Sequence, residues 1–222
     1  MNQNTLYSAS TQTSVLQTNK VLRNTYSLLA MTLVFSAICA GITMSMNMPP
    51  MGALAMTIGA FICLFIVNKQ ADKASGLAWI FVFTGLMGGA LGPLLNVYMG
   101  IPQGPELVMQ AFGLTALVFF GLSGYALTTK KDFSFMGGFL MVGLIIAVVA
   151  MIANIFLALP ALSLAISAAV VFIMSGLILF DTSRIVNGGE TNYIRATVSL
   201  YLNIYNLFVH LLSLLTAFGS DD

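Results

Sequence analysis

The chain carries very little charge. Only 7% of its 222 residues are Asp, Glu, Lys or Arg, whereas a soluble domain carries roughly 25%. Because 59% of the residues are hydrophobic, a soluble protein of this composition would lack a polar surface, and we infer that a lipid bilayer surrounds it. The formal net charge is +1, which provides no field that would attract nucleic acid.

The chain is equally poor in residues that perform catalysis or bind metals. It has one histidine, seven acidic residues and two cysteines, Cys39 and Cys63, which lie inside apolar segments without CxxC spacing. A nucleophile elbow, an HExxH motif, a P-loop and a glycine-rich dinucleotide motif are all absent from the sequence. The sequence therefore predicts a protein that is not an enzyme, without catalytic residues, metal site, cofactor or evident small-molecule substrate.

The few basic residues lie in alternate gaps between apolar segments. They precede the first segment and follow the second, fourth and sixth, and the other gaps have none: Lys20, Arg23, Lys69, Lys73, Lys130, Lys131, Arg184 and Arg195. Basic residues accumulate in the cytoplasmic loops of membrane proteins. The pattern predicts seven membrane spans, with the N-terminus in the cytoplasm and the C-terminus outside.

The apolar segments have the length of transmembrane helices, which need about 20 residues to cross the hydrocarbon layer. Two longer stretches are interrupted by proline, at Asn47-Met48-Pro49-Pro50 and at Pro160, and proline does not continue a helix. Open backbone is not stable in lipid, so the spans are expected to be helices of an all-α membrane protein. The expected spans are 26–46, 51–67, 77–99, 107–127, 134–157, 162–186 and 197–218.

Two domains follow from this pattern. Residues 1–24 are rich in Ser, Thr, Asn and Gln, and we expect them to form a flexible polar cytoplasmic tail. Residues 25–220 are expected to form a seven-transmembrane-helix bundle.

The third span is rich in glycine. Gly85, Gly88, Gly89 and Gly92 give two overlapping GxxxG spacings, which allow another helix to approach closely. Pro93 follows directly and removes one backbone hydrogen bond of the same span. The sequence leaves open whether this glycine face packs within the bundle or against a second copy of the chain.

The last span carries a stripe of polar residues. They recur at intervals of four and three residues, which places them on one narrow helical face: Ser199, Asn203, Asn206, His210 and Ser213. Unpaired polar groups are costly in lipid, so the stripe is expected to face inward and the last helix to be central. Either these groups form interhelical hydrogen bonds, or they line a hydrated path in which His210 senses protons.

The sixth span contains a single acidic residue. Asp181 lies near its C-terminal end, where a carboxylate opposes the helix dipole, and Arg184 follows on the same face. The two residues form either an ion pair at the membrane surface or part of a gate at the cytoplasmic mouth of the bundle, since acidic groups within membranes usually face the interior.

Several segments resemble the transmembrane Bax inhibitor motif family. They are Gly-Ala-Leu-Gly-Pro-Leu-Leu at 89–95, Ala-Phe-Gly-Leu-Thr-Ala-Leu-Val-Phe at 111–119, Phe-Asp-Thr at 180–182 and Ser-Leu-Tyr-Leu-Asn at 199–203. The resemblance covers essentially the whole chain after the tail. It implies a seven-helix bundle whose last helix lies inside the others.

Residues 20–26 and 188–201 resemble one bacterial branch of the family more specifically. Members of that branch modulate FtsH, a membrane-anchored ATP-dependent protease, as its substrates and its competitive inhibitors. The resemblance therefore implies an FtsH-type protease as the partner, the bacterial inner membrane as the location, and a periplasmic C-terminus.

An alternative function comes from other members of the family, which behave as pH-sensitive calcium leaks. In those proteins a pair of aspartates on the sixth and seventh helices closes the pore. Asp181 matches the first aspartate, but Asn203 stands at the second position and its amide does not ionise. This difference weakens the alternative, a pH-sensitive calcium or proton leak gated near Asp181.

Overall fold

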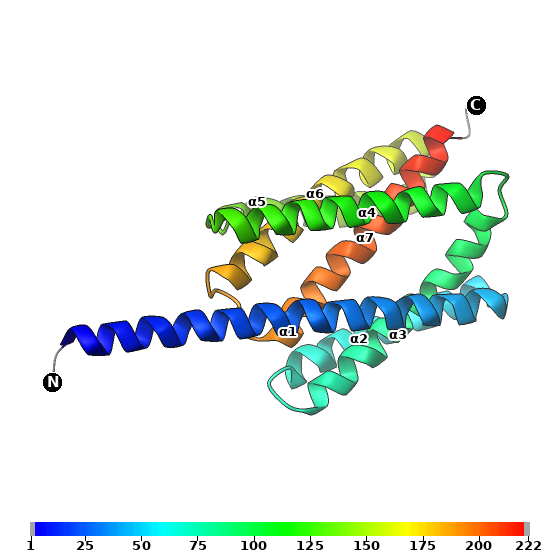
Figure 1. The fold of residues 1–222 in the computed structure, drawn as a ribbon. Helices are drawn as coiled ribbons and strands as arrows, with labels where there is room; N and C mark the ends of the chain where they lie inside the picture. Colours follow the sequence, from blue (N-terminus) through cyan, green and yellow to red (C-terminus); the bar gives the residue numbers. More distant parts are fainter. Residues whose placement is uncertain (1–2, 220–222) are drawn as a thin grey trace.

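The computed structural model describes the backbone of residues 3–219 and the side chains of residues 16–219. Within this part of the chain the structure has seven helices, and each contains a stretch long and apolar enough to cross a membrane (Figure 1). They are α1 (Gln3–Ser45), α2 (Pro50–Gln70), α3 (Ser75–Met99), α4 (Gly104–Thr129), α5 (Met136–Leu157), α6 (Pro160–Val186) and α7 (Tyr193–Gly219). The predicted all-α membrane protein with seven spans is confirmed.

Proline and positive φ angles define the helix boundaries. Pro50 and Pro160 are the first residues of α2 and α6, where a missing N–H does no harm. Asn47, in the turn after α1, has a φ of 49°, and Gly188 after α6 has a φ of 75°. The backbone N–H of Gly189 then donates to the carbonyl of Arg184 at 2.8 Å, which satisfies one of the free carbonyls at the end of α6.

The first helix is longer than the sequence suggests. It begins at Gln3, so the polar segment expected as a tail continues α1 as a helix. Residues 3–40 contain neither glycine nor proline, and adding a turn to an existing helix avoids the cost of nucleation. Leu16 is 69% exposed, and Thr25 is the first buried residue among the described side chains. The predicted flexibility of this segment stays a prediction, and residues 1 and 2 lie outside the described chain.

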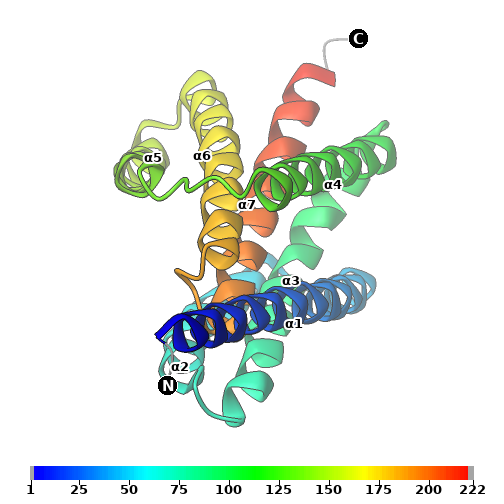
Figure 2. The same ribbon diagram turned by 60° about the vertical axis from the view of Figure 1, so that its left-hand side comes forward.

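The helices form two groups that α7 joins. In the first group α3 packs between α1 and α2, and in the second α6 packs between α4 and α5. α7 crosses from one group to the other and contacts α1, α4 and α6 (Figure 2). Among the described residues α5 contacts no helix other than α6, so it forms an edge of the bundle.

The loops that carry basic residues meet at one end of the bundle, which we call the basic end. Arg195, at the start of α7, forms an ion pair of 2.7 Å with Asp72 in the α2–α3 loop. The Asn187 side chain donates to the carbonyl of Lys131 at 3.3 Å and thus connects the α6–α7 and α4–α5 loops. This arrangement agrees with the alternation of basic residues along the sequence. Which compartment the basic end faces stays a prediction.

The glycine face of α3 packs within the bundle, against α1 and α2. A Cβ atom at Gly88 would overlap the carbonyl oxygen of Ser36, and one at Gly92 would overlap the hydroxyl of Thr43. Gly85 and Gly89 lie beside side chains of α1 and α2, respectively. α3 continues through Pro93 without interruption. Because these glycines have no side chains, the backbones of α1 and α3 can approach each other closely.

Candidate functional site

The most polar contact inside the bundle lies between α6 and α7. The Asn203 side-chain amide donates to the carboxylate of Asp181 at 2.8 Å, and Asn203 is buried. Further along the same helix pair, Nδ1 of His210 lies 3.1 Å from the hydroxyl of Ser167. The structure thus brings together three of the predicted site residues along one interface, and both pairs hold α7 against α6.

The remaining residues of the polar stripe are exposed or only partly buried. Ser199 is exposed, and Asn206 donates to the carbonyl of Leu202 in its own helix at 2.8 Å. Ser213 is partly buried. At about 100° per residue the stripe covers an arc of about 80° with Asn203 and His210 at one edge, and α6 contacts that edge. The prediction of an inward stripe is therefore wrong at Ser199, and full enclosure of α7 stays a prediction.

Arg184 has other partners than Asp181. Its guanidinium lies 3.7 Å from the carboxylate of Glu190, donates to the carbonyl of Gly189 at 3.2 Å, and stands 5.6 Å from the ring centroid of Phe180. The turn at Gly188 brings Glu190 back beside the end of α6, where it pairs with the partly exposed side chain of Arg184. Within residues 16–219 Asp181 forms no ion pair, and its direct partner is the neutral Asn203.

A group of hydroxyls joins three helices next to Asp181. The hydroxyl of Thr182 lies 3.4 Å from that of Tyr26 on α1 and 3.3 Å from that of Ser123 on α4. Thr182 and Ser123 are buried. This group is not recognisable from the sequence, because a single Ser or Thr in an apolar helix usually bonds to its own backbone and gives no signal of an interhelical contact.

Tyr201 is a second connection that the sequence did not reveal. It is 1% exposed, and its hydroxyl donates to the carbonyl of Thr84 on α3 at 3.3 Å. The same oxygen lies 2.6 Å from the hydroxyl of Ser36 on α1, which donates to it because tyrosine has only one proton to give. Tyr201 therefore attaches the last helix to the first and third.

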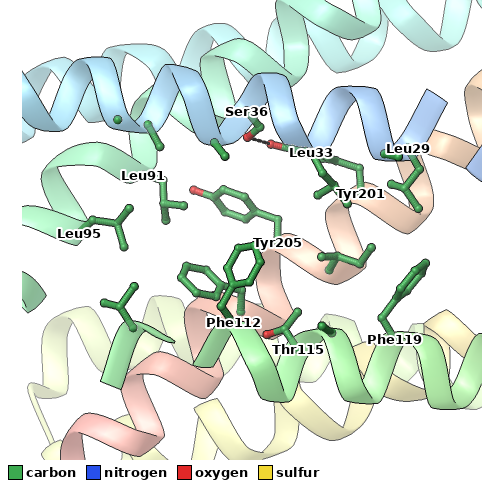
Figure 3. Close-up of a pocket in the computed structure, with 18 of the residues that line it drawn as sticks. Leu29, Leu33, Ser36, Leu91, Leu95, Phe112, Thr115, Phe119, Tyr201 and Tyr205 are labelled. Atoms are coloured by element: carbon green, nitrogen blue, oxygen red, sulfur yellow. Dashed lines mark hydrogen bonds between the residues drawn. The ribbon is translucent and has the colours of Figure 1, made fainter. Parts of the chain in front are cut away.

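An apolar slot lies on the opposite side of α7 from the Asp181–Asn203 pair. α1 and α4 form its walls, α7 forms its base, and Leu91 and Leu95 of α3 also line it; the cavity has a volume of about 530 Å³ (Figure 3). The two walls do not pack against each other as helices. Their rings meet at one place, where Tyr26 and Phe119 are 6.0 Å apart and close the slot toward the basic end.

Comparison with known proteins gives a consistent picture along the whole chain. The family model described as Bax1-I, inhibitor of apoptosis-promoting Bax1, matches residues 18–220. A protein of Vibrio cholerae called an uncharacterized membrane protein is 57% identical over 208 residues, which is 93% of each chain. The protein of Escherichia coli K12 called modulator of FtsH protease YccA is 53% identical over 211 residues, which is 95% of each chain. None of these three descriptions names an enzymatic activity.

Proposed function

Because this chain belongs to the Bax1-I family, we propose that it is a multi-pass inner-membrane protein that modulates an FtsH-type ATP-dependent protease, both as its substrate and as its competitive inhibitor. The support is the relative from Escherichia coli that bears the name of an FtsH modulator and aligns with 95% of this chain. In this proposal the basic end faces the cytoplasm, in keeping with the preference of Lys and Arg for cytoplasmic loops.

The observation that carries the proposal is the projecting start of α1. The start of α1 extends past the other helices at the basic end as far as about Thr18, which lies beside Gly188 (Figure 1), and this part of the sequence is polar. A protease that pulls on a free end needs such a segment as a handle. Once unwound, 24 residues reach at most about 80 Å, at about 3.3 Å per residue.

The handle is attached to a helix that is difficult to remove. α1 lies against the glycines of α3, and Tyr201 holds it through Ser36 at 2.6 Å. Near the basic end, Thr197 of α7 also donates to the backbone carbonyl of Thr25 at 3.3 Å. Pulling on the N-terminus therefore strains the contacts of α1 with α3 and α7 together. A substrate that engages readily and unfolds slowly occupies the protease and so inhibits the turnover of other substrates.

The test is the lifetime of the protein in cells with an active or an inactivated protease. Deletion of residues 2–19 is expected to prolong the lifetime only where the protease is active, because the bundle remains but the handle is lost. A variant whose residues 2–19 are replaced by the same residues in permuted order keeps the length and composition, and should have the lifetime of the parent. Equal lifetimes of the deletion variant and the parent would contradict the handle.

Inhibition is measured separately, with a second membrane substrate of the same protease. Overproduction of the parent should lengthen that substrate's half-life, and overproduction of the deletion variant should do so much less. Isolation of a complex between the parent and the protease from solubilised membranes tests the partner directly. If overproduction of neither protein changes the half-life of the second substrate, the protein is not an inhibitor of the protease and its proposed role is that of a substrate alone.

A second candidate function is a cation leak, and the observation that favours it is the Asp181 carboxylate between α6 and α7, which forms no ion pair within residues 16–219. A carboxylate between two transmembrane helices is costly unless it has a role or a partner. The test is calcium flux into liposomes that contain the parent or the Asp181→Asn variant, at mildly acidic and mildly alkaline pH. Equal flux in both proteins at both pH values would exclude Asp181 from any gate.

A further inference from the structure

The slot between α1 and α4 is long and narrow. Along α4 its lining runs from Val108 to Phe120, which is about 18 Å at a rise of about 1.5 Å per residue. Along α1 the lining is longer still, from Tyr26 to Met44, which is about 27 Å. A methylene chain is long, narrow and apolar like this slot, whereas a helix with its side chains is about 10 Å across.

The chemistry of the lining is that of hydrocarbon. The hydroxyls of Ser36 and Thr115 face the slot but are already used, since Ser36 bonds to Tyr201 and Thr115 donates to the carbonyl of Ala111 at 2.7 Å. Tyr205 projects from α7 into the slot (Figure 3). Water in the slot would have few groups to form hydrogen bonds with. If the slot were empty, the atoms that line it would lose van der Waals contacts on that side.

The slot is accessible from the side of the bundle. Phe112 and Phe120 line it and are 66% and 69% exposed, so they stand at a mouth between α1 and α4. Both walls belong to helices that cross the membrane, so this mouth opens toward the lipid and not toward water. We propose that the slot binds one hydrocarbon chain of a membrane lipid, which enters sideways between α1 and α4 and fills the space above α7.

Two glycines provide a matched pair of variants. Gly41 lines the slot and Gly113 of α4 does not, and a Cβ atom added at either residue would meet nothing within 4 Å. Gly41→Phe therefore fills the slot with a side chain without a clash at its Cβ. Gly113→Phe adds the same ring to the surface of α4 outside the slot and serves as the control.

The experiment uses the full chain reconstituted in phospholipid vesicles that contain a phospholipid with a photoactivatable group in its acyl chain. After illumination, labelled peptides are quantified by mass spectrometry at two places. Ile204, at the base of the slot, is only 8% exposed, and Phe156 on the outer face of α5 is 83% exposed. The parent should be labelled at both places. Gly41→Phe should lose at least about two thirds of the label at Ile204 and keep the label on α5, and Gly113→Phe should match the parent.

Absence of label around Ile204 in the parent, or equal label there in Gly41→Phe and the parent, would overturn the proposal. If Gly41→Phe also loses its label on α5, the variant is misfolded. The smaller variant Ala37→Leu is then used instead, and it should lose the label at Ile204 and keep the label on α5. Tyr205→Phe should keep its label, because a hydrocarbon chain accepts no hydrogen bond. Loss of label in that variant would overturn the proposal in favour of a ligand with a polar group.

The last arm separates lipid from protein. When an FtsH-type protease is reconstituted in the same vesicles, the label at Ile204 should remain. Its selective disappearance, with α5 still labelled, would show that a segment of the protease enters the slot and would overturn the lipid assignment. This outcome is independent of whether the protease degrades the protein, so the proposed function and the lipid site fail or succeed separately.

Discussion

Replacement of Gly88 by alanine tests how closely the first and third helices must approach. The new Cβ atom would overlap the carbonyl oxygen and the backbone carbon of Ser36. Backbone atoms do not rotate away as the end of a flexible side chain does, so α1 has to move away from α3. This movement also disturbs the hydrogen bond between Ser36 and Tyr201, which lies at the same level of the bundle.

The expected cost follows from the nature of the overlap. Adding one methyl group to a well-packed interior typically destabilises by about 1–3 kcal/mol. Weakening the Ser36–Tyr201 bond adds about 0.6 kcal/mol, the mean for interhelical hydrogen bonds in a membrane protein. For a chain of about 150–250 residues each kcal/mol shifts the melting temperature by about 2–4 °C, which gives a decrease of roughly 3–14 °C.

Thermal unfolding of the purified protein in mild detergent, followed by circular dichroism, measures the effect. Gly113→Ala is the control, because a Cβ atom there meets nothing within 4 Å and alanine is a better helix former than glycine. Its melting temperature should equal or slightly exceed that of the parent. A Gly88→Ala variant as stable as Gly113→Ala would refute the close approach of α1 and α3.

Three further predictions concern individual contacts. Asn203→Ala should lower the free energy of unfolding by about 1–3 kcal/mol, because the Asp181 carboxylate loses the side-chain amide that donates to it. Asn203→Asp is expected to lower it further by charge repulsion. Chemical unfolding in detergent measures both, and an Asn203→Ala variant as stable as the parent would contradict the contact. In a double-mutant cycle, the effects of Ser36→Ala and Tyr201→Phe on the free energy of unfolding should differ from additivity by about 0.6–1.7 kcal/mol. Additive effects would mean that the two hydroxyls do not interact. Arg195→Gln should change stability by less than about 1 kcal/mol, and less still in high salt, because its ion pair is exposed; a larger loss in the same assay would contradict a surface role.

The sequence contained the information for the number of spans and for the end at which basic residues gather. Charge and proline carry that information, because a charged side chain is costly in lipid and because Pro50 and Pro160 each begin a new helix, although α3 continues through Pro93. The contact of Asp181 with Asn203 was also within reach, since a polar group within a membrane needs a partner on a neighbouring helix.

The slot could not be predicted in the same way. In a soluble protein the apolar residues mark the inside, but in a bilayer the side chains that face lipid and those that line a cavity are equally apolar. Phe112 faces the mouth of the slot and Phe65 faces outward from α2, and nothing in their neighbourhoods in the sequence distinguishes them. Similarly, the hydroxyls of Ser36 and Thr84 look alike in sequence, yet only that of Ser36 reaches across to Tyr201.

The division of the helices into two groups has a consequence for biosynthesis. α3 makes close contacts with α1 and α2, so the first three helices can assemble while the ribosome is still producing the remainder of the nascent chain. α7 is translated last, and its side chains make the contacts that connect the two groups. A polypeptide that is released before α7 has entered the membrane therefore consists of two half-assemblies. Among the described residues these are then joined by the α3–α4 connection, sparse contacts of α1 with α6 and the Tyr26–Phe119 ring contact, and quality control would meet the chain in that open form.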